Sequence, residues 1–287
     1  MRRQEAHLAG RGRTGDERGP TERGKGNRGR APAFDPAEQT AMTDQVRPVP
    51  EFDAAGLARE LLRGIRSGAL ATLEDTGTPF ATLVTVATAH DGSPLLLLSR
   101  LAAHTLHLER DPRASILLSQ TGKGDPLAHP RLTIVGRAER SEDPIVRSRF
   151  LARHPKAELY AGFADFSFWR LTIERGHLNG GFARAATLAS GDLLTDLTGA
   201  QDLLEAEEIL LRRIPVGQPG SLATGLAGAA PGPWTATGLD PEGLDLAAGE
   251  RTARVAFPQR VASPDAFRRA FADLLARAAD GAKAKGT

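Results

Sequence analysis

The sequence predicts an α+β protein in which a mostly antiparallel β-barrel precedes a smaller α+β domain. Short segments rich in Thr, Val and Leu alternate with turn signals between residues 68 and 182, as is typical of a barrel. After residue 190 the pattern changes to helical and Gly-rich segments. We therefore expect a disordered basic segment over residues 1–48, the barrel domain over 49–190, and the small C-terminal α+β domain over 191–287.

The barrel domain is expected to begin with one amphipathic helix. Asp53 is a good N-cap, and apolar side chains recur at helical spacing as far as Ile65, before Gly68 ends the run. Three strands joined by short turns should follow as a meander, over residues 69–74, 80–89 and 94–99.

Helices and strands alternate through the rest of this domain. The helical pattern over 102–110 ends at Asp111-Pro112, because proline disfavours a helical residue before it. Residues 119–130 lack apolar periodicity and predict a loop, and loops of this length are often binding elements. A helix beginning at Asp143-Pro144 should turn three apolar side chains inward, those of Ile145, Val146 and Phe150. The remaining strands are expected over 114–118, 131–140, 166–173 and 177–182.

The α+β domain shows a helical pattern over 200–213 and a hairpin pattern around Ala248-Gly249, with strands over 239–246 and 252–257. Ser263-Pro264-Asp265 begins a final helix. Its apolar face consists of Phe267, Phe271, Leu274 and Leu275.

Composition restricts the chemistry of the chain. None of the 287 residues is Cys, so disulfides and thiolate metal sites are excluded. The longest apolar runs have the length of a strand, whereas a helix that crosses a bilayer needs about 20 apolar residues. We therefore expect no membrane span and no membrane partner, and a cytoplasmic location fits the composition.

Positive charge is concentrated near the N-terminus. Residues 1–41 hold nine Lys or Arg against six Asp or Glu, and the remainder is nearly neutral, with 28 against 29. Because the remainder offers no long basic face, we expect no nucleic-acid partner. The composition of residues 1–41 is typical of disorder. Either translation begins at Met42, or these residues form a functional basic arm.

The common motifs for nucleotide and hydrolase sites are missing, among them G-x-G-x-x-G, the P-loop, H-E-x-x-H and G-x-S-x-G. One junction is a candidate anion site. A buried-strand pattern ends at Ser99 and runs into a helix start, where free backbone N–H groups favour an anion. Ser99, His104 and Thr105 are placed to surround a phosphate there. The alternative is that Ser99 caps the turn and His104 is solvated.

Three further residues have two interpretations each. His107 lies three residues after His104, but no third ligand is in sight, so we expect no metal site. Arg131 follows the predicted loop and either pairs with a phosphate or carboxylate or lies on the surface. His177 precedes Gly180-Gly181, so it either lies near a ligand or is a hydrogen-bonded structural residue.

Short motifs follow one another in a fixed order through residues 57–188. They include Leu96-Leu97-Leu98-Ser99, Ala102-Ala103-His104-Thr105, Asp111-Pro112-Arg113-Ala114-Ser115, Pro130-Arg131-Leu132-Thr133, Phe168-Trp169-Arg170-Leu171 and Gly180-Gly181-Phe182. In this order they resemble the FMN-binding split barrels of the pyridoxamine 5'-phosphate oxidase-like family. The segments 238–246 and 255–258 look like the α+β domain that follows the barrel in the haem-utilisation branch of that family.

The resemblance implies a homodimer that binds FMN between two split barrels, and members of this branch bind or degrade haem. It assigns the contacts with the flavin ring to the strand residues Thr82, Leu83, Val84 and Thr85. It assigns the phosphate to Ser99, His104 and Thr105, places Gln120 and Arg131 near the ring or phosphate, and lets Trp169 reach across.

The function that the resemblance implies is that of an FMN-dependent oxidoreductase of the haem-utilisation type, with haem as a small-molecule substrate or ligand. Two alternatives stay open: a non-catalytic binding or regulatory protein of tetrapyrrole metabolism, and a flavin oxidase or reductase of another small molecule. The chain also departs from the pattern. The Arg and Lys of the vitamin oxidases are missing from the strand over 82–86, and no His follows His177.

Overall fold

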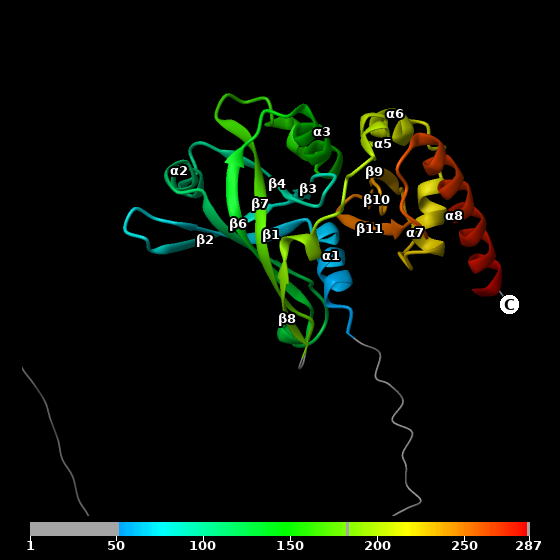
Figure 1. Cartoon of the computed structure of the whole chain (residues 1–287), viewed down its shortest axis with the longest axis horizontal. Coiled ribbons are helices and arrows are strands. Elements are labelled where there is room, and N and C mark those ends of the chain that lie inside the picture. Colours follow the sequence, from blue (N-terminus) through cyan, green and yellow to red (C-terminus); the bar gives the residue numbers. More distant parts are fainter. Residues whose placement is uncertain (1–51, 182–183, 286–287) are drawn as a thin grey trace, which may run out of the picture. The chain divides into compact units, whose positions relative to one another are not determined.

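The computed structural model describes residues 52–181 and 184–285. The predicted disordered segment over 1–48 and the alternative start at Met42 lie outside these residues. The barrel is one antiparallel sheet of eight strands in the described part of the chain, in the order β2-β1-β5-β6-β7-β4-β3, with β8 also pairing with β7 (Figure 1). The strands are β1 (Ser67–Leu73), β2 (Pro79–Thr85), β3 (Ala87–Thr88), β4 (Pro94–Ser99), β5 (Arg113–Ser119), β6 (Arg131–Arg140), β7 (Phe166–Asn179) and β8 (Ala185–Ala189).

The sheet curls because its two outermost strands follow each other in the chain. β2 and β3 lie at opposite ends of the strand order, yet Val86 is the only residue between them. The two edges must therefore approach each other at Val86, which is fully buried and donates its N–H to the Arg66 carbonyl at 2.7 Å. This confirms the predicted α+β class with an antiparallel split barrel.

Two strand predictions need correction. The predicted strand over 80–89 breaks at Val86, and β4 pairs with β7 instead of continuing a meander with β2. The two strands predicted over 166–173 and 177–182 are joined in one long strand, β7, which ends at Asn179, and residue 182 lies outside the described residues. β7 keeps its pairing with β6 through a bulge near Glu174, where the register shifts between Val135 and Gly136.

Helices cover the barrel. These are α1 (Ala54–Gly64), α2 (Ala103–Arg110) and α3 (Pro144–Arg153), and α1 begins at the predicted cap, where the Gly56 N–H donates to Asp53 Oδ1 at 2.7 Å. α1 ends at Gly64 instead of Gly68, because the backbone turns into β1 at Ser67. In α3, Val146 and Phe150 are buried as predicted, but Ile145 is 40% exposed, since it lies on the other side of the helix.

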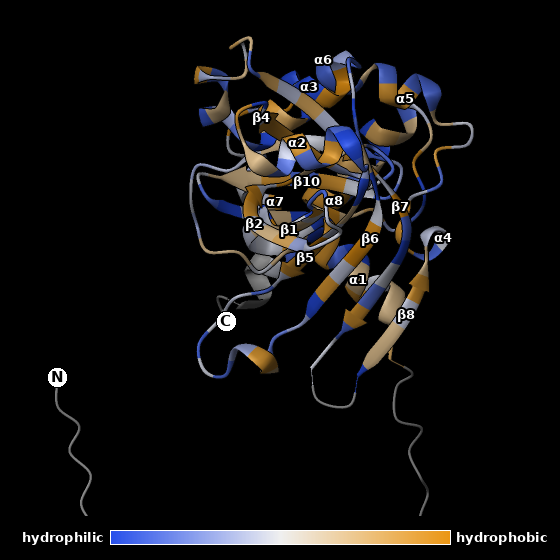
Figure 2. Ribbon diagram, turned by 90° about the vertical axis from the view of Figure 1, so that its left-hand side faces the viewer, coloured by the Kyte–Doolittle hydropathy of each residue, from blue (hydrophilic) through white to orange (hydrophobic). Residues whose placement is uncertain are grey.

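The core explains the apolar runs of the sequence. Alternate residues of the strands fill the barrel, and Figure 2 shows apolar and polar residues along β6 and β7. β4 is apolar on both faces: Leu96 and Leu98 point into the barrel core, whereas Leu95 and Leu97 pack in a second cluster with Phe150 of α3. Each such fully buried Leu contributes about 1.5–3 kcal/mol.

The C-terminal α+β part has a core of its own. This part contains the sheet β11-β10-β9 and the helices α5 (Gln201–Glu205), α6 (Glu207–Arg212), α7 (Gln218–Gly225) and α8 (Pro264–Lys285). The short helix α4 (Ser190–Leu193) packs on the barrel instead, since Leu193 lies in the barrel core. The strand predicted over 239–246 is two strands, β9 (Thr235–Asp240) and β10 (Gly243–Ala248), because the chain turns at Pro241. The next strand is β11 (Arg251–Ala256). The domain boundary at residue 190 stays a prediction.

Buried ion pairs connect the barrel helices to the C-terminal part. Arg63 of α1 pairs with Asp240 of β9 at 2.8 Å, and Arg149 of α3 pairs with Glu207 of α6. Asp240 is fully buried and also pairs with Arg254 of β11 at 2.8 Å. Among the described helices, none is both long and apolar enough to cross a membrane.

Candidate functional site

The barrel is split between β2 and β4. β2 pairs only with β1, and β4 pairs with β7 along its length but with β3 only at Pro94 and Leu95. The edges of β2 and of the second half of β4 therefore form no ladder with each other. α2 begins directly after β4 and packs against β1 and β2, so its first turn lies beside this split.

Ser99 has the structural role that was its alternative interpretation. Its hydroxyl donates to Asp165 Oδ2 at 2.7 Å and accepts from the Leu101 N–H at 3.1 Å. Ser99 therefore caps the turn before α2. The Asp165 carboxylate also places a negative charge next to it, which disfavours a phosphate at this hydroxyl.

Thr105, by contrast, has a polar group without a partner. Its side chain is fully buried, and its hydroxyl makes no hydrogen bond within the described residues. The helix start is also uncapped, because Ala102 stands at the N-cap position and offers no side-chain acceptor. A buried hydroxyl beside free helix N–H groups is the arrangement that an anion would complete.

His104 lies half-buried one residue before Thr105. Burial lowers the pKa of His104 below its ordinary value, and the nearby His107 lowers it further. His107 itself is structural: its Nδ1 lies 3.0 Å from the Thr72 hydroxyl, and its ring meets Phe80 edge-on. In the part of the chain that the structure describes, no group of three metal-ligating side chains occurs.

The four predicted residues of β2 do not face one site with their side chains. Val84 is buried in the barrel core and Thr82 is half-buried, whereas Leu83 is 77% exposed and Thr85 is exposed. What the four share is the backbone of an edge strand beside the split. Contacts with a planar ring would therefore come from backbone groups, as the resemblance implies.

Gln120 and Arg131 lie far from Ser99 within the same chain. Ser99 pairs with Phe166 at the beginning of β7, whereas Arg131 pairs with Asn179 at its end. The Gln120 N–H donates to the Pro130 carbonyl at 3.0 Å, which keeps it beside Arg131. The fold therefore does not bring these two residues to the start of α2 within one chain.

Trp169 is 2% exposed. Its Nε1 donates to the Ser167 hydroxyl at 3.0 Å, and the Arg140 guanidinium stacks over the ring at 5.5 Å from its centre. In this conformation Trp169 packs within its own barrel.

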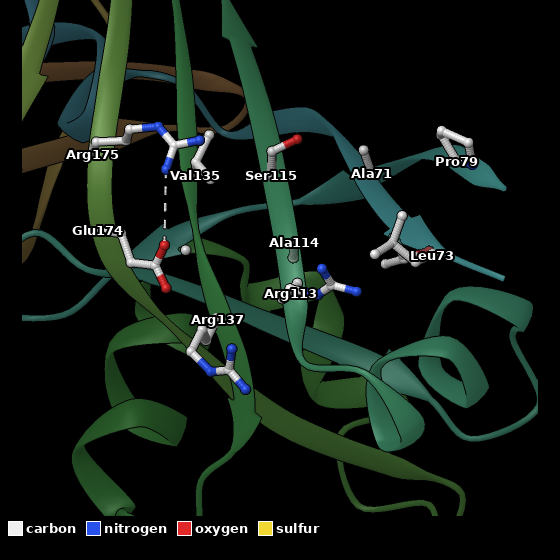
Figure 3. Close-up of a pocket in the computed structure, with 12 residues that line it drawn as sticks. Ala71, Leu73, Pro79, Arg113, Ala114, Ser115, Val135, Arg137, Glu174 and Arg175 are labelled. Atoms are coloured by element: carbon white, nitrogen blue, oxygen red, sulfur yellow. Dashed lines mark ion pairs between the residues drawn. The ribbon is translucent and has the colours of Figure 1, made fainter. Parts of the chain in front are cut away.

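A pocket that the sequence analysis did not identify lies on the outer face of the sheet. It has a volume of about 410 Å³ and is lined by Ala71, Ser115, Val135, Arg113, Arg137 and Arg175 among others (Figure 3). Its signal in the sequence is weak: arginines that alternate with core residues along strands, and alternation alone does not tell which strands become neighbours.

Comparison with known proteins agrees with the split barrel. The family profile described as pyridoxamine 5'-phosphate oxidase matches residues 56–180. A structure of a protein of unknown function from Agrobacterium tumefaciens is 38% identical, covers 78% of this chain and 96% of its own, and superposes with a TM-score of 0.71. The chain belongs to the pyridoxamine 5'-phosphate oxidase-like family. The predicted family is thereby confirmed.

Two further relatives of this pyridoxamine 5'-phosphate oxidase-like protein have names that mention haem. The non-canonical heme oxygenase HOZ of Arabidopsis thaliana is 36% identical over 141 residues, which are 47% of this chain and 42% of that protein. The chain thus matches less than half of the length of this curated relative. A heme binding protein from Mycobacterium smegmatis is 31% identical and covers 79% of this chain and 98% of its own, with a TM-score of 0.47.

Proposed function

We propose that this pyridoxamine 5'-phosphate oxidase-like protein binds FMN in the split between β2 and β4, with the phosphate at the start of α2. The observation that carries this proposal is the fully buried, unpartnered hydroxyl of Thr105 next to an uncapped helix start. The residues at the start of α2 fit a phosphate, because the Thr105 hydroxyl has no partner among the described residues and the first N–H groups of the helix point toward an anion. Ser99 contributes less directly, since it is engaged with Asp165.

His104 would add a positive charge beside the phosphate. A phosphate dianion beside the imidazole favours the protonated form, so the pKa that burial has lowered rises again on binding. When bound, the flavin supplies the electron chemistry, and the chain supplies binding, orientation and exclusion of water. The backbone of β2 would position the ring along the split.

We expect a variant with both His104→Ala and Thr105→Ala to bind FMN roughly tenfold more weakly or worse, because it loses two donors to a charged group. Flavin fluorescence quenching measures the affinity. Riboflavin, which lacks the phosphate, should bind both proteins alike. Thr198→Ala, at an exposed threonine, is the control. An unchanged FMN affinity of the double variant would move the phosphate site elsewhere.

We further propose a homodimer. Arg131 and Gln120 lie at the opposite end of β7 from Ser99, so they could meet a ligand at α2 only from a second protomer. The outer face of β2, β1 and β5 leaves Leu83 and Leu117 exposed, by 77% and 39%. Exposed apolar side chains that gather on a sheet face are typical of an interaction surface.

Leu83→Arg should shift the protein from dimer to monomer and weaken FMN binding in parallel, because a charge would be buried at the interface. Light scattering after size exclusion measures the mass. Leu159→Arg, at a position 81% exposed on a different element, is the matched control and should leave the mass unchanged. A dimer that persists in the Leu83 variant would place the interface elsewhere.

The reaction that we propose is oxidative degradation of haem with FMN as cofactor, supported by the name of the Arabidopsis relative. The absence of any His after His177 favours the second candidate, a non-catalytic haem-binding protein, because an axial ligand from the C-terminal part is missing. Haem titration followed by a reductant under oxygen separates the two. Consumption of the haem Soret band supports the enzyme, and a band that persists supports the binding protein.

A further inference from the structure

The sheet of the C-terminal part has an open edge that lines a cavity. β11 pairs with β10 on one side, and no strand in the described part of the chain pairs with its other side. A cavity of about 760 Å³ lies between this strand and α1, which contacts β11 (Figure 1). Four of the six residues of β11 line the cavity: Thr252, Ala253, Arg254 and Ala256. Because side chains alternate along a strand, a cavity that meets residues of both faces follows the edge of the sheet.

The hydrogen-bond ladder shows which backbone groups of β11 are free. The Phe257 N–H donates at 2.8 Å to the carbonyl of Glu242, which lies directly opposite, so these two residues form a hydrogen-bonded pair. In an antiparallel sheet such pairs alternate with pairs that are not hydrogen-bonded. The residues of β11 whose N–H and C=O groups point to the open edge are therefore Thr252, Arg254 and Ala256. All three line the cavity, so these donors and acceptors are available to a ligand there.

The open edge is accessible from one end. The Thr252 hydroxyl donates to the Gly64 carbonyl at 2.7 Å, so the end of α1 closes the edge at Thr252. Ala256, at the other end of the strand, is exposed. β11 contains no Pro, and its register with β10 has no bulge, so it lacks two features that protect edge strands in other proteins. A stretch of about 10 Å is left for a short extended segment.

The cavity has an excess of negative charge. At its base Arg63 and Arg254 are balanced by the carboxylates of Asp240 and Asp245, each ion pair being 2.8 Å long. The charged side chains that line the cavity and form no ion pair within the described residues are Glu60, Glu242 and Arg59. Two carboxylates against one guanidinium favour a ligand with a basic side chain.

We infer that the open edge of β11 binds a short extended segment of a partner protein as a fourth strand of the sheet, with a Lys or Arg side chain facing Glu60 and Glu242. Backbone hydrogen bonds to Arg254 and Ala256 supply the affinity, and the two carboxylates select the basic side chain. The inference goes beyond the proposed function, because this surface is formed by α1 and β11 and requires neither the flavin nor the dimer.

The test uses the full chain and a blocked pentapeptide, acetyl-Thr-Val-Lys-Val-Thr-amide, as the probe. Binding should slow the hydrogen exchange of the Arg254 and Ala256 amides, measured residue by residue by NMR, because only a strand at the open edge gives them partners. The amide of Val255 should not change, since it is already bonded to β10. Replacing the Lys of the peptide by Gln should weaken binding roughly fivefold, as measured by fluorescence anisotropy of labelled peptides.

Ala256→Pro should weaken binding of the Lys peptide roughly tenfold or more, because proline removes the N–H and places its ring at the edge. The urea midpoint should change little, since this N–H takes no part in the ladder. Ala256→Thr, which keeps the N–H, is the matched control. A second variant leaves the strand intact: Glu60→Gln combined with Glu242→Gln should bind the Lys and Gln peptides alike.

Three outcomes would overturn the inference. The first is that the wild-type chain binds no peptide at millimolar concentration. The second is that Ala256→Pro binds it as tightly as Ala256→Thr does. The third is that the Arg254 and Ala256 amides of the free protein exchange as slowly as that of Val255, because the edge would then be covered by the chain itself or by a second copy. FMN binding is independent of all three outcomes.

Discussion

Asp240→Asn is expected to lower the free energy of unfolding by about 3–5 kcal/mol, because it leaves buried arginines without their counter-charge. Asp240 is fully buried between Arg63 and Arg254, each at 2.8 Å. Burial alone would raise the pKa of Asp240, but the two guanidinium groups outweigh it and hold the pKa at about 2. An Asn amide would direct N–H groups toward donors, so it cannot replace the carboxylate.

Urea unfolding followed by fluorescence measures this loss. Glu208→Gln is the control, since Glu208 forms an exposed pair with Arg212 within α6 and such pairs are worth about 0.3–0.5 kcal/mol. Arg63→Met combined with Asp240→Leu should recover part of the loss, because an apolar pair removes both buried charges. A midpoint for Asp240→Asn equal to that of the control would show that the buried pairs contribute little.

The same ion pairs should also couple the unfolding of the barrel to that of the C-terminal part. Arg63 lies on α1 of the barrel, whereas Asp240 and Arg254 lie in the C-terminal sheet. Since the two parts have separate cores, loss of Asp240 should also separate their unfolding transitions. Trp169 and Trp234 lie in different cores and report on the two parts independently.

Lowering the pH from 6.5 to 4 is expected to cost the wild-type protein about 3 kcal/mol of stability through His154 alone. His154 is 8% exposed, and burial is the main reason that its pKa is lowered from 6.5 to about 4. The neutral ring donates from Nε2 to the Val86 carbonyl at 2.9 Å and accepts from Arg66 at Nδ1. It thereby holds the residue at which the barrel edges meet.

The free energy of unfolding falls with the pH because the two states bind protons differently at His154. Between pH 4 and 6.5 His154 binds a proton in the unfolded chain but stays neutral in the folded chain. Proton binding therefore stabilises the unfolded state relative to the folded state as the pH falls. The stabilisation is complete above pH 6.5 and is lost as the pH falls toward 4. His154→Gln, which can still donate to Val86, should flatten this part of the profile, whereas His177→Gln, at an exposed His, should not. Unfolding midpoints measured across this pH range test the prediction. Parallel profiles of the wild type and of His154→Gln would show that His154 is not the source of the pH dependence.

The sequence by itself determined the local elements and the family. The bounds of β4 and β6 follow from their apolar patterns and flanking turns, and the buried face of α8 carries Phe267, Phe271 and Leu274 as predicted. The resemblance of the ordered motifs implied the split barrel, and the helix start at residues 102–105 predicted an anion site, which stays a prediction. The helix and strand bounds are properties of neighbouring residues, so local periodicity contains them, whereas the family followed from the resemblance of the ordered motifs.

Only the tertiary structure decided which distant segments meet. Periodicity along a strand does not specify its partner, so the pairing of β4 with β7 and the turn at Val86 were missed. For the same reason the sequence grouped Ser99 with Arg131, which lie at opposite ends of β7, and overlooked the pocket that gathers Arg113, Arg137 and Arg175. The unpartnered hydroxyl of Thr105 likewise became visible only once packing had excluded other partners from it.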